Sequence, residues 1–326
     1  MSLLSVENLH VHFVSRGLDN KVRTAKALNG VSFQVVEGEV LGLVGETGAG
    51  KSLTALALLG LLRAPAQVVQ GRVLFEGQEL GVLDRGQGDE VRGKRITLIP
   101  QSPKTSLDPL ARIGNQLVRM QREHGEKSHA RATERALNML AQVQIPDPER
   151  RMQTWPHELS GGMAQRILIA AGLINSPRLV IADEPTTGLD LTVQAEVLDT
   201  LRRLVKANGM SAIIITHDLG IVAHYCDRMA VMFAGAIVEE GPVRDVFREQ
   251  RHPYTGSLIA STPKQIARQG FSQVGGTPPD LYALPKGCTY QDRCTKAQAV
   301  CSSPVPTATF ASGHRAFCHF PREPVA

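Results

Sequence analysis

The sequence predicts an α/β fold with a parallel core sheet, an antiparallel β part, a helical insertion at roughly residues 105–165, and a small irregular C-terminal segment rich in cysteine. Three observations predict it. Short apolar runs alternate with amphipathic stretches through the first 250 residues, a glycine-rich loop follows one of those runs, and prolines and cysteines concentrate after residue 250. With 326 residues, 42% of them apolar, the chain can form one large domain and a smaller piece.

The central strands are predicted from three short apolar runs. These are "GEVLGLVG" (38–45), "RLVIAD" (178–183) and "SAIIIT" (211–216). Nearly continuous apolar runs are typical of parallel strands that helices cover on both faces. The opening residues, "MSLLSVENLHVHF", alternate apolar and polar side chains and predict a further strand with one exposed face.

Helices and turns are predicted between the strands. The stretches 128–143 and 192–207 each place apolar side chains on one helical face. Two strand pairs look like hairpins that turn at 37–38 and at 234–235. After residue 250 the close spacing of prolines disfavours long helices and central strands, so this segment is expected to have a thin core of its own.

The N-terminal residues, the apolar runs and the net charge indicate where in the cell the protein lies and which partners it has. The first residues lack the basic head and apolar block of a signal peptide, so the protein is expected in the cytoplasm. The longest apolar run, "LTALALLGLL" (53–62), is far shorter than the ~20 residues of a membrane-spanning helix, so a membrane role requires a partner. The net charge of +5 is spread along the chain, which gives little support to a nucleic-acid partner.

A nucleotide site is predicted from "GETGAGKS" (45–52), which ends a strand and begins a helix. Glycines let backbone N–H groups surround phosphate oxygens, and the helix N-terminus adds a favourable dipole. Lys51 would reach the β- and γ-phosphates, and Ser52 would ligate Mg²⁺. The residues of this phosphate loop are Gly45, Glu46, Thr47, Gly48, Ala49, Gly50, Lys51 and Ser52.

A pair of carboxylates follows the second buried strand, in "LVIADEP" (179–185). Parallel strands bring ligands to their carboxyl ends, so both side chains are expected beside the phosphates. Asp183 suits Mg²⁺ coordination, and Glu184 suits a general base that polarises the attacking water.

A second phosphate grip is predicted from "ELSGGMAQR" (158–166). Ser160, Gly161 and Gly162 begin an amphipathic helix and give another N-terminus with close backbone access for an anion. One nucleotide does not need two such grips from a single chain. The second grip therefore suggests a site that is shared between chains.

Together these motifs resemble those of the ATP-binding-cassette (ABC) ATPases, from residue 1 to about 250. The resemblance implies a RecA-like core sheet with antiparallel and helical subdomains. It also implies two chains paired head to tail, each signature sequence closing on the partner's ATP. In the family's terms, Gln101 looks like the Q-loop glutamine that serves catalysis and Mg²⁺, and Asp190 looks like the D-loop aspartate. His217 looks like the switch histidine at the γ-phosphate, and Phe13 like the aromatic ring on adenine.

The tail is similar to the C-terminal extension of ATPases from the peptide/nickel class of ABC importers. The matching stretches are "RHPYTGSLIASTP" (251–263), "LPKGCTYQDRC" (284–294) and "GHRAFCH" (313–319). The resemblance implies a cassette over 1–250 and an extension over 251–326. It also implies a heterodimer with a second related ATPase, two permease subunits and an extracytoplasmic binding protein, with the chain peripheral on the cytoplasmic face of the cell membrane.

The cargo is left open between peptides, which come first, and nickel or metal chelates. A soluble ABC ATPase acting on nucleic acid or ribosomes is a less favoured function. Those proteins generally carry paired cassettes or very long insertions, and this chain has one cassette and no basic arm.

The cysteines of the tail predict a metal site. Disulfides rarely persist in a reducing cytoplasm, so four cysteines in an irregular segment indicate a metal, either Zn²⁺ or an iron–sulfur cluster. The alternative is four unlinked thiols. The resemblance favours a 4Fe–4S cluster of structural role, with ATP binding independent of it. His314 and His319 are substitute ligands for which a surface or hydrogen-bonding role is favoured, and Cys226 is expected to be a small buried side chain. The four ligands are Cys288, Cys294, Cys301 and Cys318.

Overall fold

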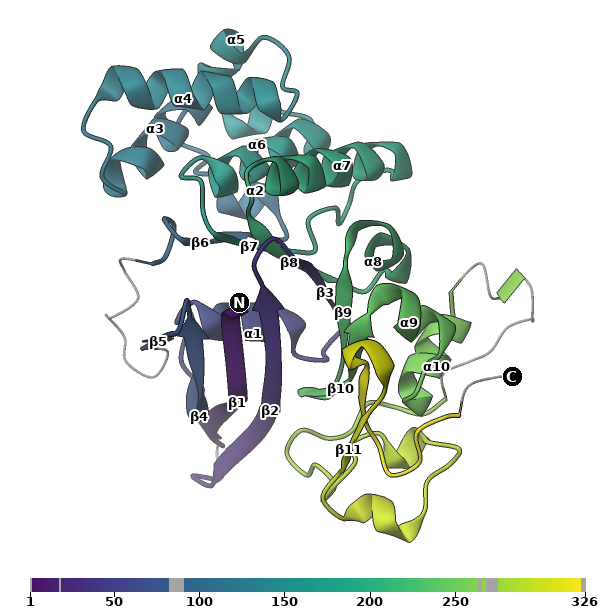
Figure 1. Cartoon of the computed structure of the whole chain (residues 1–326). Helices are drawn as coiled ribbons and strands as arrows, with labels where there is room; N and C mark the ends of the chain where they lie inside the picture. Colours follow the sequence, from purple (N-terminus) through teal and green to yellow (C-terminus); the bar gives the residue numbers. More distant parts are fainter. Residues whose placement is uncertain (1, 18, 82–90, 263–265, 268–274, 324–326) are drawn as a thin grey trace. The chain divides into compact units, whose positions relative to one another are not determined.

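The computed structural model describes residues 2–17, 19–81, 91–262, 266, 267 and 275–323. The chain divides into two compact units (Figure 1). The first unit contains Met1–Val36, Leu41–Gln87 and Thr216–Ala326, and the second contains Glu37–Val40 and Gly88–Ile215.

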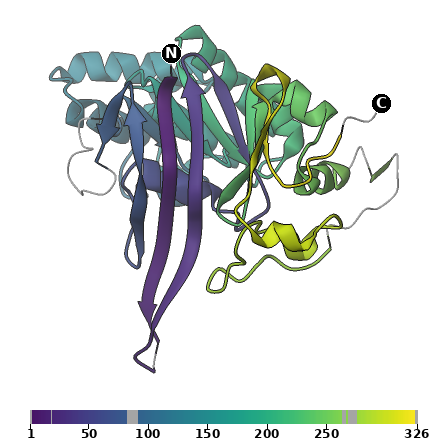
Figure 2. The same ribbon diagram turned by 60° about the horizontal axis from the view of Figure 1, so that its bottom comes forward.

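An antiparallel sheet of four strands, in the order β2-β1-β4-β5, belongs to the first unit. Its two longest strands lie side by side over 15 residues each (Figure 2). Leu4 and Val6, and again Leu9 and Val11, are buried alternate residues of β1, as its apolar-polar alternation predicts, and the register shifts between the two pairs. The strands are β1 (Ser2–Arg16), β2 (Val22–Val36), β4 (Ala66–Phe75) and β5 (Gln78–Leu80).

The hairpin predicted at residues 37–38 is wrong. β2 pairs with β1, whereas β3 (Val40–Val44) pairs in parallel with β9 (Arg228–Phe233). Gly38 has a φ of +70°, which glycine adopts without strain and which turns the chain between the two pairings. All five residues of β3 are buried, so this strand needs the interior position that a parallel sheet provides.

The first unit also contains strands in the order β3-β9-β10-β12-β11. The hairpin predicted at 234–235 is confirmed, because β9 and β10 (Ala236–Pro242) pair antiparallel across these two residues. Ala234 and Gly235 both have positive φ, the conformation of a type I′ turn. Three helices of this unit are α1 (Lys51–Leu58), α8 (Leu219–Tyr225) and α9 (Val243–Arg248).

The second unit combines three parallel strands with helices. The strands β6 (Ile96–Ile99), β7 (Leu179–Asp183) and β8 (Ser211–Thr216) pair in register and confirm the predictions at 178–183 and 211–216. The helices predicted at 128–143 and 192–207 are α4 (His129–Gln142) and α7 (Leu191–Ala207).

Four helical elements of the second unit lie within the predicted insertion at 105–165, and two more overlap its ends. Within the part of the chain that the structure describes, no helix is long and apolar enough to cross a membrane. Besides α4, the helical elements in or at the ends of the insertion are α2 (Pro103–Ser106), α3 (Ile113–Glu123), α5 (Pro148–Met152), the 3₁₀ turn η1 (Pro156–Glu158) and α6 (Gly161–Leu173).

The extension joins the first unit instead of forming a separate core. Its strand β12 (Arg315–Phe317) pairs with β10, and β11 (Thr307–Thr309) pairs with β12. The predicted thin, independent core is therefore wrong, because the cassette sheet supplies the partner strand. In its described residues the extension also contains α10 (Pro253–Ala260) and the 3₁₀ turns η2 (Gln291–Arg293), η3 (Ala299–Ser302) and η4 (Ala311–Gly313). Pro263 of the quoted motif lies outside the described residues.

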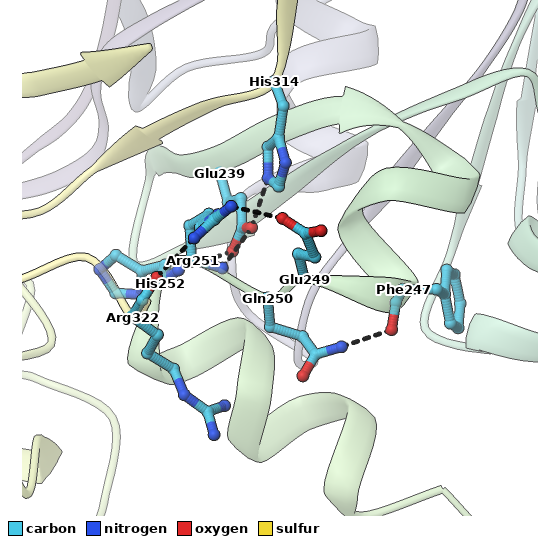
Figure 3. A network of polar contacts seen from close by, with 8 residues as sticks. All are labelled: Glu239, Phe247, Glu249, Gln250, Arg251, His252, His314 and Arg322. Atoms are coloured by element: carbon cyan, nitrogen blue, oxygen red, sulfur yellow. Dashed lines mark hydrogen bonds and ion pairs between the residues drawn. The ribbon is translucent and has the colours of Figure 1, made fainter. Parts of the chain in front are cut away.

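A buried carboxylate fastens this extension to β10 (Figure 3). Glu239 is 0% exposed, and its two oxygens accept the backbone N–H groups of Arg251 at 2.7 Å and His252 at 2.8 Å. The ring of His314 lies 2.7 Å from the same carboxylate. Satisfied buried hydrogen bonds fix geometry, and these link both ends of the extension to one strand.

Candidate nucleotide-binding site

The phosphate loop has a backbone that requires glycine at two points. Gly45 has a φ of +157°, and a Cβ there would lie 2.1 Å from the carbonyl oxygen of Met232. Gly50 has a φ of +103°, and a Cβ would lie 2.7 Å from a methyl carbon of Leu28. Larger residues would displace the loop from β9 and β2, so the motif's glycines serve packing as well as phosphate access.

Lys51 holds the loop around its ammonium group. Its Nζ donates to the carbonyl oxygens of Gly45 at 2.8 Å and Glu46 at 3.0 Å. The Glu46 carbonyl also accepts the N–H of Ala49 at 3.1 Å. Lys51 is 6% exposed and begins α1, so a buried positive charge and a helix N-terminus converge on the loop. Ser52, in the first turn of α1, is exposed.

The second unit brings two predicted catalytic residues together. Gln101 Nε2 donates to Glu184 Oε2 at 2.9 Å, and the hydroxyl of Thr187 donates to the same oxygen at 2.9 Å. The backbone N–H of Glu184 donates to Ile215 O at 2.9 Å, which continues the pairing of β7 with β8. Asp183, the last residue of β7, is half-buried. The sequence did not single out Thr187, because a threonine in a turn carries no distinctive signal.

The signature serine and the predicted D-loop aspartate both cap helices. Ser160 Oγ accepts the N–H of Met163 at 3.3 Å at the start of α6, and Asp190 Oδ1 accepts the N–H of Val193 at 3.0 Å at the start of α7. A Cβ on Gly162 would lie 2.7 Å from Val193 Cγ1, so these two helix N-termini lie close together. Ser160 and Gly161 are exposed, which leaves the predicted phosphate grip accessible.

Two predicted nucleotide contacts lie elsewhere in the first unit. Phe13 is half-buried in β1, where it pairs with Ala25 of β2 and Ala66 of β4. His217 is exposed directly after β8. The structure holds these residues and the phosphate loop in the first unit and holds Gln101, Asp183, Glu184 and the signature in the second.

The four tail cysteines lie near one another. Burial raises the pKa of Cys288 to about 11, against an opposing hydrogen bond from the backbone N–H of Tyr290 and with smaller contributions from the other three thiols. Burial, with smaller contributions from the thiols of Cys294 and Cys301, also raises the pKa of Cys318. Among the described residues, however, no group of three or more His, Cys, Asp and Glu side chains is arranged to hold a metal ion. The cysteines thus lie near one another, but the described side chains show no ready-made metal site.

The structure also shows the surroundings of Cys226, His314 and His319. Cys226 is 8% exposed, which confirms a small buried side chain. His314 bonds to Glu239, and His319 lies 3.4 Å from the carbonyl oxygen of Ser303, so both take part in hydrogen bonding.

Two residues of the extension reach the phosphate loop, and sequence reasoning missed both. Arg293 forms an ion pair with Glu46 at 3.0 Å, and the hydroxyl of Tyr254 accepts the Glu46 N–H at 3.0 Å. No sequence signal could have identified the Arg293 contact, since 247 positions separate the two residues.

Comparison with known proteins decides the family. A family model described as "ABC transporter" matches residues 28–187, and one described as "Oligopeptide/dipeptide transporter, C-terminal region" matches residues 238–301. The dipeptide transport ATP-binding protein DppD of Bacillus subtilis is 42% identical over 95% of this chain and 92% of its own length. The chain belongs to the ABC ATPases of dipeptide and oligopeptide transport.

Other relatives of this ABC ATPase agree. A probable peptide ABC transporter ATP-binding protein of Sinorhizobium fredii is 45% identical over 97% of this chain and 94% of its own. The oligopeptide transport ATP-binding protein OppD of Escherichia coli is 42% identical over 99% of this chain and 94% of its own.

Solved structures show the cassette fold. A dimeric ATP-binding cassette in a post-hydrolysis state, bound to ADP and phosphate, has a TM-score of 0.64 and 26% identity, covering 74% of this ABC ATPase and 99% of that chain. The protein cbiO1 of Clostridium perfringens, part of an ABC transporter complex, has a TM-score of 0.61 and 27% identity, covering 82% and 97% of the two chains.

Proposed function

We propose that this ABC ATPase energises the uptake of dipeptides and oligopeptides into a bacterial cell. The observation that carries the proposal is the match of residues 238–301 to the oligopeptide/dipeptide transporter C-terminal region. Relatives that match nearly the whole chain are named for peptide transport, which favours peptides over the nickel or metal-chelate alternative.

ATP binds at the phosphate loop in this proposal. The loop's backbone N–H groups and Lys51 hold the phosphates, with the loop formed by Gly45, Glu46, Thr47, Gly48, Ala49, Gly50 and Ser52. Phe13 stacks on the adenine ring, and its half-exposed ring in β1 is compatible with that contact.

Mg²⁺ would be held by oxygen atoms, which it prefers, from Ser52, Asp183 and the Gln101 amide. When bound, the ion neutralises charge on the β- and γ-phosphates. Because Gln101 Nε2 donates to Glu184, its amide oxygen is the atom that remains for a metal. Glu184 takes a proton from the attacking water, and the bonds from Gln101 and Thr187 to one of its oxygens orient the carboxylate. His217 contacts the γ-phosphate.

The signature acts on a partner's nucleotide in this proposal. Ser160, Gly161 and Gly162, with Asp190 at the neighbouring helix, complete the ATP site of a second related ATPase. ATP then drives closure only through its tighter binding to the closed pair, and hydrolysis reopens it. Two permeases and an extracytoplasmic binding protein complete the importer, and the chain lies on the cytoplasmic face of the membrane.

The test is transport by the assembled importer in reconstituted vesicles that hold ATP inside, with the binding protein outside. The chain, its companion ATPase, the permeases and the binding protein would be expressed in cells that lack endogenous peptide uptake. ATP-dependent uptake of a labelled tripeptide is expected, and Glu184→Gln should abolish it. Uptake of radioactive nickel without uptake of di- or tripeptides would replace the peptide function by the metal alternative.

The tail cysteines carry a separate part of the proposal. Cys288, Cys294, Cys301 and Cys318 hold a 4Fe–4S cluster, or Zn²⁺ as the alternative, that stabilises the extension. Support comes from their mutual proximity and from thiolate sulfur being the donor that such clusters take. Anaerobically purified protein should contain about four irons per chain. Stoichiometric zinc without iron would favour the Zn²⁺ alternative. Protein that contains neither iron nor zinc would contradict the proposed metal site.

A further inference from the structure

Each polar group of Glu46 in the phosphate loop is anchored. Arg293 donates from Nη1 to Glu46 Oε2 and from Nη2 to Oε1, both at 3.0 Å. The Glu46 N–H donates to the hydroxyl of Tyr254 at 3.0 Å, and its carbonyl accepts Lys51 Nζ at 3.0 Å. Two of these three anchors come from the extension.

The ion pair between Arg293 and Glu46 is largely buried on the arginine side and is supported by further contacts. The side chain of Arg293 is 5% exposed, and that of Glu46 is 28% exposed. Arg293 Nε donates to Gly275 O at 2.8 Å, and the guanidinium carbon lies 5.3 Å from the ring centroid of Phe233 and 5.6 Å from that of Tyr290. A bidentate pair held in this way is stronger and more directional than an exposed one.

Tyr254 provides the second anchor from a rigid cluster. It is 0% exposed, and its ring centroid lies 4.7 Å from that of Phe233 and 5.3 Å from that of Tyr290. Burial raises the pKa of Tyr254, so its hydroxyl stays protonated at neutral pH. The oxygen still accepts the Glu46 N–H, and a buried backbone donor that loses its acceptor costs free energy.

We propose that Arg293 and Tyr254 are positioning residues that hold the phosphate loop in its nucleotide-binding shape, so that the C-terminal extension sets the affinity of the chain for ATP. A glycine-rich loop loses conformational freedom when it orders around phosphates. Anchoring Glu46 in advance removes part of that loss, and preorganisation of this kind raises affinity.

Through these contacts the C-terminal extension takes part in nucleotide binding. The sequence predicted that ATP binding is independent of the cysteine segment. Arg293 directly precedes Cys294, and it ends the 3₁₀ turn η2 that begins at Gln291. A disturbance of this segment therefore moves the group that holds Glu46.

The experiment measures MgATP affinity of the full chain by calorimetry, with turnover measured in the assembled importer. Arg293→Gln should weaken MgATP binding about fivefold or more, the range of a typical coupling between sites. Tyr254→Phe, which removes only the hydroxyl, should weaken it in the same direction. In the importer, the KM for ATP should rise with little change in kcat, since the loop is affected and the reacting groups are not.

The matched control is Lys296→Gln, which removes an exposed cation from the same segment. Its MgATP affinity should equal that of the wild type. Arg293→Lys keeps the charge but cannot form the bidentate pair, so its MgATP affinity should lie between those of the wild type and Arg293→Gln. The exchange Glu46→Arg with Arg293→Glu restores opposite charges and should bind MgATP more tightly than Arg293→Gln.

Two results would overturn the proposal. The first is wild-type affinity in a folded Arg293→Gln chain whose thermal midpoint is lowered, because the pair would then be merely structural. The second applies if Arg293→Gln does not fold. In that case, wild-type affinity and KM in both Arg293→Lys and Tyr254→Phe would show that the extension does not position the loop.

Discussion

Gln101 and Glu184, 83 positions apart in the chain, are joined by a 2.9 Å hydrogen bond from the glutamine amide to the carboxylate. The glutamine is exposed in the segment after β6, and the glutamate follows β7. Thr187 donates to the same carboxylate oxygen from the turn that follows. The proposed base thus takes its orientation from an exposed loop residue, and a movement of that loop would misalign it.

Replacing Glu184 by glutamine should leave ATP binding intact and stop turnover. Loss of a general base typically costs ~10²- to 10⁴-fold in rate, whereas the amide keeps the size and the hydrogen bonding of the side chain. Phosphate release by the assembled importer measures turnover, and calorimetry measures binding. Undiminished hydrolysis would remove Glu184 from the base role.

Gln101→Ala should lower kcat by roughly 10- to 100-fold, because small misplacements of a catalytic group have effects of this size. Thr187→Val removes the other hydrogen bond to the same oxygen and should act in the same direction. Thr105→Val is a suitable control, since the Thr105 hydroxyl donates to Ser102 O instead. Equal kcat in Gln101→Ala and the control would show that the 2.9 Å bond does not orient the base.

Ser160→Arg should impair the partner's nucleotide site and spare the chain's own. Ser160 is exposed at the N-terminus of α6, where an arginine would fill the proposed phosphate grip and also lose the cap to Met163. Photo-crosslinking of labelled ATP to each subunit of the importer would report the two sites separately. Loss of labelling only on the mutated chain would contradict the head-to-tail arrangement.

Acid should loosen the extension through His252. Burial lowers the pKa of His252 to about 4, with Glu239 opposing the shift. Because the unfolded chain has an imidazole pKa of about 6.5, it binds more protons than the folded chain between these values. Stability due to neutral His252 is therefore complete above pH 6.5 and falls by about 3 kcal/mol as the pH drops to 4.

The variant His252→Asn isolates this effect. Asparagine can still accept the N–H of Tyr254, which His252 Nδ1 accepts at 3.1 Å, but it does not titrate. Denaturant unfolding at several pH values between 7 and 4 should show a steeper loss of stability for the wild type than for the variant. Parallel pH dependences would exclude His252 as the acid-sensitive group.

The sequence by itself determined the elements whose signals are local. The runs around β3, β7 and β8 are continuously apolar because each strand is buried, and α4 and α7 have one apolar face. The motifs at 45–52 and 158–166 lie at helix N-termini as predicted, since glycine and serine favour those positions locally. The hairpin at 234–235 was also predictable from its alanine-glycine turn.

Only the tertiary structure decided which distant segments pair. β2 alternates buried and exposed residues along much of its length and β3 is buried throughout, and each pattern suits several neighbours equally well. The turn at 37–38 therefore could not reveal that the two strands join different partners. The same holds for β12 beside β10, and for Arg293 beside Glu46. Side-chain type and periodicity report burial and local conformation, but the choice of partner depends on how the whole core packs. The anchoring of the phosphate loop by the extension is a product of that packing.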